Sequence, residues 1–283
     1  YTWLWSPDIT NQVLPWFQFQ AGEWHRGRLP LWDPHQAAGH SLIGQGQPGV
    51  AYPPNWILFC LPLNNGWIRE TCLDWYFLHI HFLAALFCYW LCRDLKRSRP
   101  ASVLGATVFS LGGYLGISDW PQMRNGAIWI PLVFLFMLRS LRGRKPTGNA
   151  ALAGMFLGAS WLSGHHQVPI FVTLVVTAVW LYHVVGGLRL HWRVLSSALL
   201  FYVFAALTSG LQTLPSFEYA GLAKRWVGLA EPVGWNDPIA YTVHTEFSLR
   251  PTHLLGLVIS GIHWHSDPLV GVVALTLAAA GIG

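Results

Sequence analysis

Apolar stretches almost long enough to cross a bilayer recur through most of this chain, and they restrict its fold more than any other feature. A helix needs about 20 predominantly apolar residues to cross the hydrocarbon core. The composition agrees, because 53% of the residues are hydrophobic and only 10% are charged, whereas about 25% are charged in a typical soluble domain. The sequence therefore predicts an all-α fold, a polytopic transmembrane helix bundle.

Six transmembrane spans are expected between about residues 73 and 211, and residues 269–283 resemble the start of a further span. The chain begins at Tyr1 within an aromatic segment and stops at Gly283 inside an apolar run. We therefore expect residues 1–283 to be a fragment of one transmembrane domain. The whole domain would also include a span before residue 1 and a further part after residue 283. The expected spans are residues 73–92, 101–117, 126–141, 150–163, 168–185 and 194–211.

Basic residues mark every second connection between these spans. Segments 93–99, 139–145 and 189–193 carry ten of the 17 Lys and Arg residues, together with the single acid Asp94. Connections rich in Lys and Arg stay on the cytoplasmic side of a membrane, so the alternate connections face outwards. This topology also explains the net charge of +5, which gives no reason to expect a nucleic-acid partner.

A long polar segment precedes the first span and is predicted to be an extracytoplasmic loop. Residues 1–56 are rich in Gly, Pro, His and Trp and contain Asp8 and Asp33. Within them, residues 10–25 have the pattern of an amphipathic helix that lies at the membrane interface. We interpret this loop as a catalytic loop on the membrane surface, to which later outward turns add polar residues.

The two acids of this loop each allow two interpretations. Asp8 would be half desolvated at the outer end of the preceding span, which suits a carboxylate to proton abstraction; alternatively it caps a helix. Asp33 precedes Pro34, and Asp-Pro often starts a turn; alternatively its carboxylate contacts a substrate or an ion.

Three later outward segments carry further candidate residues. Asp119 and Arg124 lie in a turn, where the guanidinium either reaches the membrane surface or binds a phosphate. The next turn holds His165, His166 and Gln167, for which hydrogen bonds to a sugar or phosphate are favoured over metal binding, because adjacent histidines are not a specific ligand spacing. The outer loop 212–251 contributes Gln212, Glu218 and Arg225, and its outward-facing cations suggest either an anionic lipid partner or ordinary headgroup contact.

Motifs of soluble nucleotide or hydrolase chemistry are absent from the sequence. It contains no Gly-rich phosphate loop, no GxSxG and no HExxH. No cofactor is indicated, although a divalent metal is compatible with the histidines. A second group, His263-Trp264-His265-Ser266-Asp267, is a weak metal signal because it defines no third-ligand geometry.

The order of these motifs resembles the YfhO-type bacterial membrane proteins over nearly the whole chain. Each motif is short, and their order and shared side carry the resemblance. They are Pro7-Asp8 with Gln12 and Pro15, Leu29-Pro30-Leu31-Trp32-Asp33-Pro34, Gly39, Tyr52-Pro53-Pro54, Gly164-His165-His166-Gln167, and Gln212 with Pro215, Glu218 and Arg225.

This resemblance implies the fold of membrane glycosyltransferases of the GT-C type, in the bacterial cytoplasmic membrane. Such enzymes move a sugar from a polyprenyl-phosphate donor to an extracytoplasmic acceptor, which is a glycan, a lipid or a protein. An acid in the first outer loop maps to Asp8. Two alternatives remain open, a transporter of lipid-linked saccharides and a non-catalytic membrane assembly subunit. A transporter would need polar residues within the spans, and His79 and His81 are the main ones.

Overall fold

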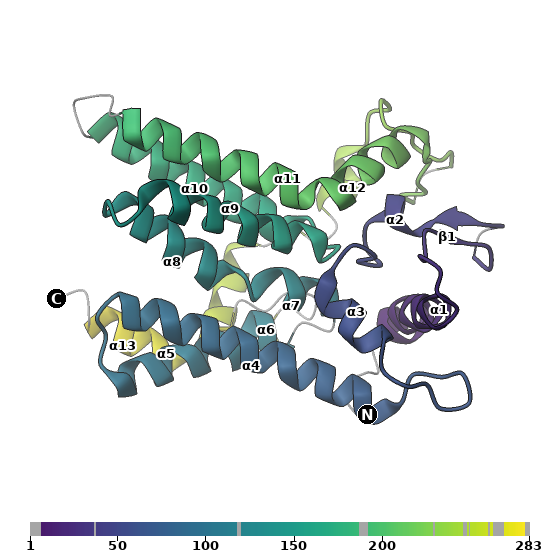
Figure 1. Ribbon diagram of the computed structural model, residues 1–283, viewed down its shortest axis with the longest axis horizontal. Helices are drawn as coiled ribbons and strands as arrows, with labels where there is room; N and C mark the ends of the chain where they lie inside the picture. The colour runs from purple at the N-terminus through teal and green to yellow at the C-terminus, as the bar shows by residue number, and fades with distance from the viewer. Residues whose placement is uncertain are drawn as a thin grey trace.

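The computed structural model describes residues 7–36, 38–117, 120–186, 192–228, 230–245, 248, 250–259, 261–262 and 269–280. It is mostly helical, with 71% helix and 3% strand, so the prediction of a helical fold is confirmed. Figure 1 shows the long helices side by side, with short elements gathered at one end. We call the six long helices α4 (Glu70–Asp94), α5 (Arg99–Leu111), α8 (Ile130–Leu141), α9 (Pro146–Leu162), α10 (Gln167–Gly186) and α11 (Trp192–Leu222) the helical body.

The elements follow in chain order, with the wide helical turn η1 (Ile9–Val13) leading directly into α1 (Leu14–His25). A hairpin of β1 (Trp32–Asp33) and β2 (His40–Ser41) comes next. The remaining elements are α2 (Leu42–Gln45), α3 (Pro53–Phe59), α4 (Glu70–Asp94), α5 (Arg99–Leu111), α6 (Gly113–Ile117), α7 (Pro121–Ala127), α8 (Ile130–Leu141), α9 (Pro146–Leu162), α10 (Gln167–Gly186), α11 (Trp192–Leu222), α12 (Tyr241–Thr245), the 3₁₀ helix η2 (Pro251–Leu257) and α13 (Val272–Ala280).

Three of the described helices, α4, α10 and α11, are long and apolar enough to cross a membrane. The other expected spans coincide with shorter or interrupted helices. The span expected at 101–117 is divided at Gly112 into α5 and α6, and the span expected at 126–141 begins earlier and is divided into α7 and α8. Proline explains the second division, because Pro121 and Pro131 both occupy a first helical turn, where the missing N–H costs nothing.

The helix expected to end at Leu211 continues instead to Leu222, so the N-terminal part of the expected outer loop is helical. Pro215 lies inside α11, and proline within a helix removes a backbone hydrogen bond and bends the helix. Figure 1 shows α11 changing direction in its C-terminal part. The correction matters for the site, because Gln212 and Glu218 are placed by a helix rather than by a loop.

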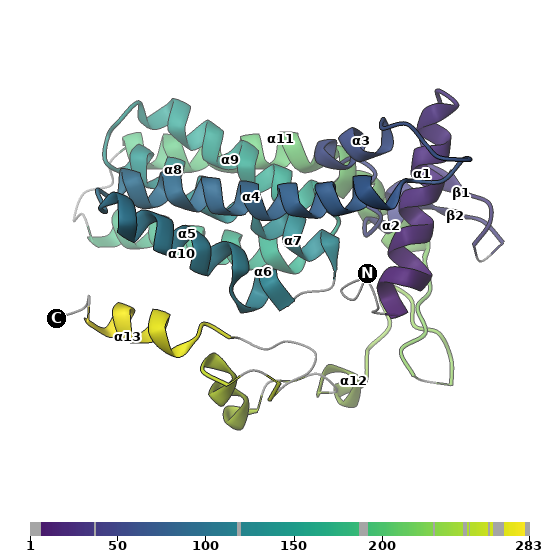
Figure 2. The same cartoon turned by 90° about the horizontal axis from the view of Figure 1, so that it is seen from below.

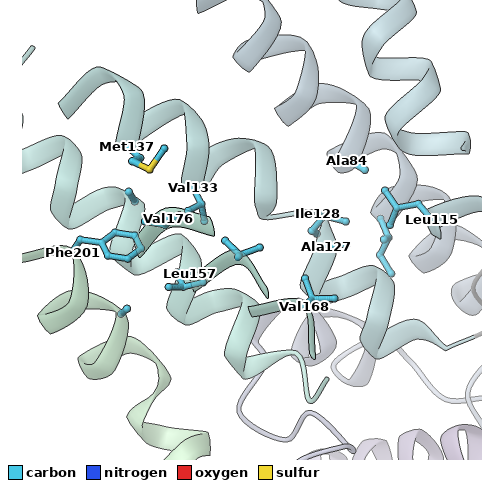
Figure 3. Close-up of a cluster of buried hydrophobic side chains, with 14 of the residues drawn as sticks. Ala84, Leu115, Ala127, Ile128, Val133, Met137, Leu157, Val168, Val176 and Phe201 are labelled. Carbon is cyan, nitrogen blue, oxygen red and sulfur yellow. The ribbon is translucent and has the colours of Figure 1, made fainter. Parts of the chain in front are cut away.

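Small residues allow α9 and α11 to pack closely. A Cβ atom added at Gly154 would lie 2.2 Å from the carbonyl oxygen of Phe201, and one at Gly158 would lie 2.5 Å from Cβ of Thr208. Two small residues four positions apart are a common contact surface between membrane helices. Figure 3 shows Phe201 of α11 facing the same cluster as Leu157 and side chains from α8 and α10.

The two ends of the helical body differ in chemistry. At the first, which we call the loop end, lie η1, α1, the hairpin, α2 and α3 (Figure 1). Figure 2 shows α1 running across the direction of α4. At the opposite end, which we call the arginine end, Asp94 bonds to Arg139 and Arg142 at 2.7 and 3.0 Å.

The described C-terminal elements α12, η2 and α13 lie along one side of the molecule in Figure 2. The backbone N–H of Gly113 donates to the carbonyl of Leu269 at 2.9 Å, which connects this segment to α6. An apolar hollow of about 630 Å³ separates α13 from α5. It contains none of the candidate site residues.

Candidate functional site at the loop end

The first loop is folded against itself by a short hairpin that the sequence did not predict. Asp33 pairs with His40 across the hairpin, and its side chain is 2% exposed. Oδ1 of Asp33 accepts a hydrogen bond from the backbone N–H of His35 at 2.8 Å, which is the geometry of an Asp turn. This hydrogen bond agrees with the interpretation of Asp33 as a turn-forming residue, and it constrains the loop.

Asp8 lies immediately before η1 and is half-buried beside the start of α7. The indole Nε1 of Trp120 donates a hydrogen bond to its Oδ2 at 3.2 Å. Residues 112 positions apart in the chain are therefore in contact at the loop end. The bond leaves Oδ1 of Asp8 for another partner, and it orients the carboxylate relative to α7. Asp119, which precedes Trp120, lies outside the described residues.

A buried polar network joins the first loop to α4 and α7. The Tyr52 hydroxyl donates to the carbonyl oxygen of Asn125 at 3.2 Å, and the amide nitrogen of Asn125 donates to the Tyr76 hydroxyl oxygen at 2.8 Å. Tyr76 in turn donates to Oδ1 of Asn55. Burial raises the pKa of Tyr52 well above its ordinary value, so its hydroxyl remains a donor. The network connects the first loop to α4 and α7, and Oδ1 of Asn125 has no hydrogen-bond partner among the described residues.

Two further polar side chains of α7 are buried close to this network. Gln122 is 1% exposed, and neither of its amide atoms has a hydrogen-bond partner among the described residues. Arg124 is 6% exposed, with its guanidinium carbon 5.8 Å from the centre of the Phe77 ring. Unpaired buried amides cost about 1–3 kcal/mol each, so Gln122 is a polar group that a bound hydroxyl or water would satisfy.

The turn between α9 and α10 packs directly against the first loop. A Cβ atom added at Gly164 would lie 2.6 Å from the carbonyl oxygen of Gln47, and one at Gly46 would lie 3.0 Å from Nε2 of His166. His166 also contacts Trp161 edge to face, with ring centres 5.5 Å apart. Both histidines are half-buried. The structure thus brings this turn to the same end as Asp8 and Trp120.

The imidazoles of this turn are uncharged near neutral pH. Burial, and then the neighbouring His166, lower the pKa of His165 to about 4. Burial also lowers the pKa of His166. Nδ1 of His165 is buried and has no hydrogen-bond partner in the part of the chain that the structure describes. The pair can therefore donate or accept hydrogen bonds at pH 7 but supplies no positive charge.

The extended part of α11 holds the first loop from the other side. Gln212 is fully buried, and its amide nitrogen donates to the carbonyl of Ile43 and, at 3.1 Å, to the Ser216 hydroxyl. Its Oε1 atom has no hydrogen-bond partner among the described residues. Gln212 is thus a residue that positions the loop, from the turn of α11 that precedes Pro215.

Three other candidate residues are exposed, and their side chains take part in none of the contacts described above. Gln167 begins α10, and Glu218 lies on the outer part of α11. Arg225 pairs through its backbone with Val233. Within the described part of the chain no group of three or more His, Cys, Asp or Glu side chains is arranged to hold a metal ion. Residues 263–267 lie outside it.

The polar network was missed at the sequence level for a physical reason. Tyr76 lies within an apolar run and Asn55 begins a short one, so hydropathy alone treats them as parts of helices. One signal was available, because Gln122 and Asn125 share a short segment with Arg124 next to an apolar span. Several polar groups at the end of a span are costly in lipid unless they contact one another.

The low pKa of His165 predicts that acid destabilises the fold. The unfolded chain, with a pKa of 6.5, binds a proton as the pH falls below 6.5, whereas the folded imidazole stays neutral until about pH 4. Stability is therefore complete above pH 6.5 and is lost towards pH 4. We expect a loss of about 1 kcal/mol at pH 5, reduced from the full linkage value by partial exposure.

The measurement is the thermal unfolding midpoint in detergent at pH 7 and pH 5. His165→Gln should shrink the difference between the two midpoints, because it removes the titrating group. His183→Gln, on the exposed side of α10, is the matched control and should leave the difference unchanged. An equal pH response in wild type and His165→Gln would contradict the prediction.

The chain matches no protein-family model, no curated protein and no solved structure. Its function is therefore argued from the geometry of the loop end.

Proposed function

We propose that this chain belongs to a membrane glycosyltransferase of the YfhO type. In this proposal the helical body is a polytopic GT-C-like bundle in the bacterial cytoplasmic membrane, with the loop end facing outwards. The donor is a sugar on a polyprenyl phosphate, and the acceptor is an envelope glycan, a lipid or a protein. No cofactor is required by the residues at the loop end.

The contact between Asp8 and Trp120 is the observation that carries the proposal. It holds a half-buried carboxylate 3.2 Å from an indole nitrogen at the start of α7. Arg124 follows one helical turn later, and the backbone N–H of Arg124 lies 3.4 Å from the carbonyl of Trp120. The Asp8 carboxylate therefore contacts the residue that precedes α7, and Arg124 belongs to α7. In this proposal Asp8 is the general base and Arg124 is the cation that binds the lipid phosphate.

The proposed reaction is a displacement at the anomeric carbon of the donor sugar. Asp8 removes the proton from the acceptor hydroxyl as its oxygen attacks the anomeric carbon. The bond between this carbon and the phosphate oxygen breaks, and its electron pair leaves with the polyprenyl phosphate. Arg124 stabilises the charge that develops on this phosphate. The proton remains on Asp8 until it is exchanged with water.

Because His165 and His166 are neutral, they are proposed to form hydrogen bonds with the substrate and not to stabilise its negative charge. Donation from an imidazole N–H of His165 or His166 would orient the phosphate or a sugar hydroxyl. The close approach of His166 to Gly46 supports a place for them beside the first loop. The buried Gln122 amide is proposed as an additional contact for a sugar hydroxyl.

The remaining candidates are proposed to shape or border the site. Asp33 and Gln212 hold the loop through His35 and Ile43. Asp119 is proposed to contact a sugar or acceptor hydroxyl. The exposed Gln167, Glu218 and Arg225 are proposed to meet the acceptor or the lipid headgroups at the membrane surface.

Transfer assays with the full-length protein test this function. Purified protein in liposomes would receive a short polyprenyl phosphate that carries a radiolabelled hexose, with envelope glycan or lipid extract as acceptor. The proposal expects the label to leave the polyprenyl phosphate and to enter a covalent product. Movement of intact labelled lipid between the leaflets without any covalent product would instead establish a transporter.

A further inference from the structure

A second hollow, with both charged and apolar side chains in its wall, lies at the arginine end, opposite to the candidate site. It has a volume of about 360 Å³. Its wall combines cationic and apolar side chains, an unusual mixture for a solvated surface. The lining residues are Trp90, Arg93, Asp94, Leu135, Phe136 and Arg139.

The charge in this region is strongly positive, because one carboxylate faces several guanidinium groups. The Asp94 side chain is only 4% exposed and accepts from Nε of Arg139 at 2.7 Å and from Arg142 at 3.0 Å. Arg144 approaches it at 3.7 Å. The single negative charge of Asp94 therefore neutralises only one of these three guanidinium groups. Arg93, which also lines the hollow, adds a fourth positive charge. An anion is the ligand that this surplus would attract.

Arg139 is held in a fixed orientation at the wall of the hollow. Its Nε atom is bonded to Asp94, and its guanidinium carbon lies 5.5 Å from the centre of the Phe136 ring. No described residue accepts a hydrogen bond from its terminal nitrogens. A planar guanidinium with two available donors matches the oxygens of a phosphate.

The position of the hollow favours a lipid over a soluble phosphate. It lies beside the last turn of α4, one of the helices apolar enough to cross a membrane. Trp90 is 46% exposed there, and Trp residues of membrane helices concentrate at the headgroup level. Leu135 and Phe136 provide an apolar wall on which the glycerol and upper acyl carbons of a lipid would pack.

We propose that this hollow binds the headgroup phosphate of an anionic phospholipid. Arg139 and Arg93 contact the phosphate oxygens, and Trp90 and Phe136 contact the glycerol region. The buried Asp94 holds Arg139 in place and is not itself a ligand. The proposal is independent of sugar transfer, because it concerns the end of the helical body opposite to Asp8.

The test uses the purified chain in detergent and phosphatidylglycerol as the probe, with binding measured by native mass spectrometry. Arg93→Gln should weaken phosphatidylglycerol binding about fivefold, the effect of removing one cation close to an anionic lipid surface. Arg93 is exposed and bonds only to the carbonyl of Arg97 among the described residues, so the fold should survive. Arg93→Lys should restore most of the affinity.

Lys96→Gln is the matched control, because it removes the same charge at the same end but does not line the hollow. It should change the affinity less than twofold. Equal losses in Arg93→Gln and Lys96→Gln would overturn the site in favour of diffuse charge attraction. Equal binding of phosphatidylcholine, or equally tight binding of free glycerol 3-phosphate, would overturn the assignment to an anionic lipid.

Discussion

Replacing Asp8 with Asn is expected to reduce sugar transfer by the full-length protein about 10²- to 10⁴-fold, the usual contribution of a positioned general base. The amide keeps the size of the carboxylate and can still accept from Trp120, whose indole lies 3.2 Å away. It cannot accept a proton from the acceptor. The loss should therefore appear in kcat, with little change in the thermal unfolding midpoint.

Asp33→Asn is the matched control for this result, because it makes the same exchange in the same loop. An Asn side chain also accepts from the His35 backbone N–H, so transfer should fall less than about threefold. Trp120→Phe, which keeps an aromatic ring but removes the indole N–H that donates to Asp8, should give an intermediate loss. If Asp8→Asn transfers sugar at the wild-type rate, the role of Asp8 as base is wrong.

The second large effect is expected at the contact between α9 and α11. Gly154→Ala should lower the free energy of unfolding by about 1–3 kcal/mol, the usual cost of overpacking. The added methyl would lie 2.2 Å from the Phe201 carbonyl oxygen, so two helix backbones must separate. Gly154→Leu should prevent this packing altogether. Thermal unfolding of the purified chain in detergent measures both changes.

Gly148 provides the control within the same helix. A Cβ atom added there would meet nothing within 4 Å, and alanine favours a helix by about 1 kcal/mol over glycine. Gly148→Ala should therefore leave the unfolding midpoint unchanged or raise it. Equal destabilisation by Gly148→Ala and Gly154→Ala would mean that close packing of α9 on α11 does not limit stability.

The helices α4 and α1 illustrate why helical segments could be predicted from the sequence. Hydropathy is a property of consecutive residues, so an apolar run such as 73–92 identifies a helix without any knowledge of its neighbours. The amphipathic pattern of residues 10–25 similarly predicts a helix, and η1 with α1 occupies this segment. The sequence predicts the end of the sixth span at residue 211, where the apolar run gives way to the polar segment from Gln212. In the structure α11 continues to Leu222, and Gln212 and Ser216 in this continuation donate to the carbonyl of Ile43.

The sequence by itself determined that the chain is helical, that apolar helices long enough for a bilayer are present, and that polar and basic segments alternate between them. Only the tertiary structure decided that Asp8 contacts Trp120 and that His166 meets Gly46. It also decided that Asn55, Tyr76 and Asn125 form one buried network. The reason is that a local pattern specifies an element and its apolar face, whereas proximity between distant residues depends on how backbones pack, as at Gly154 and Gly164.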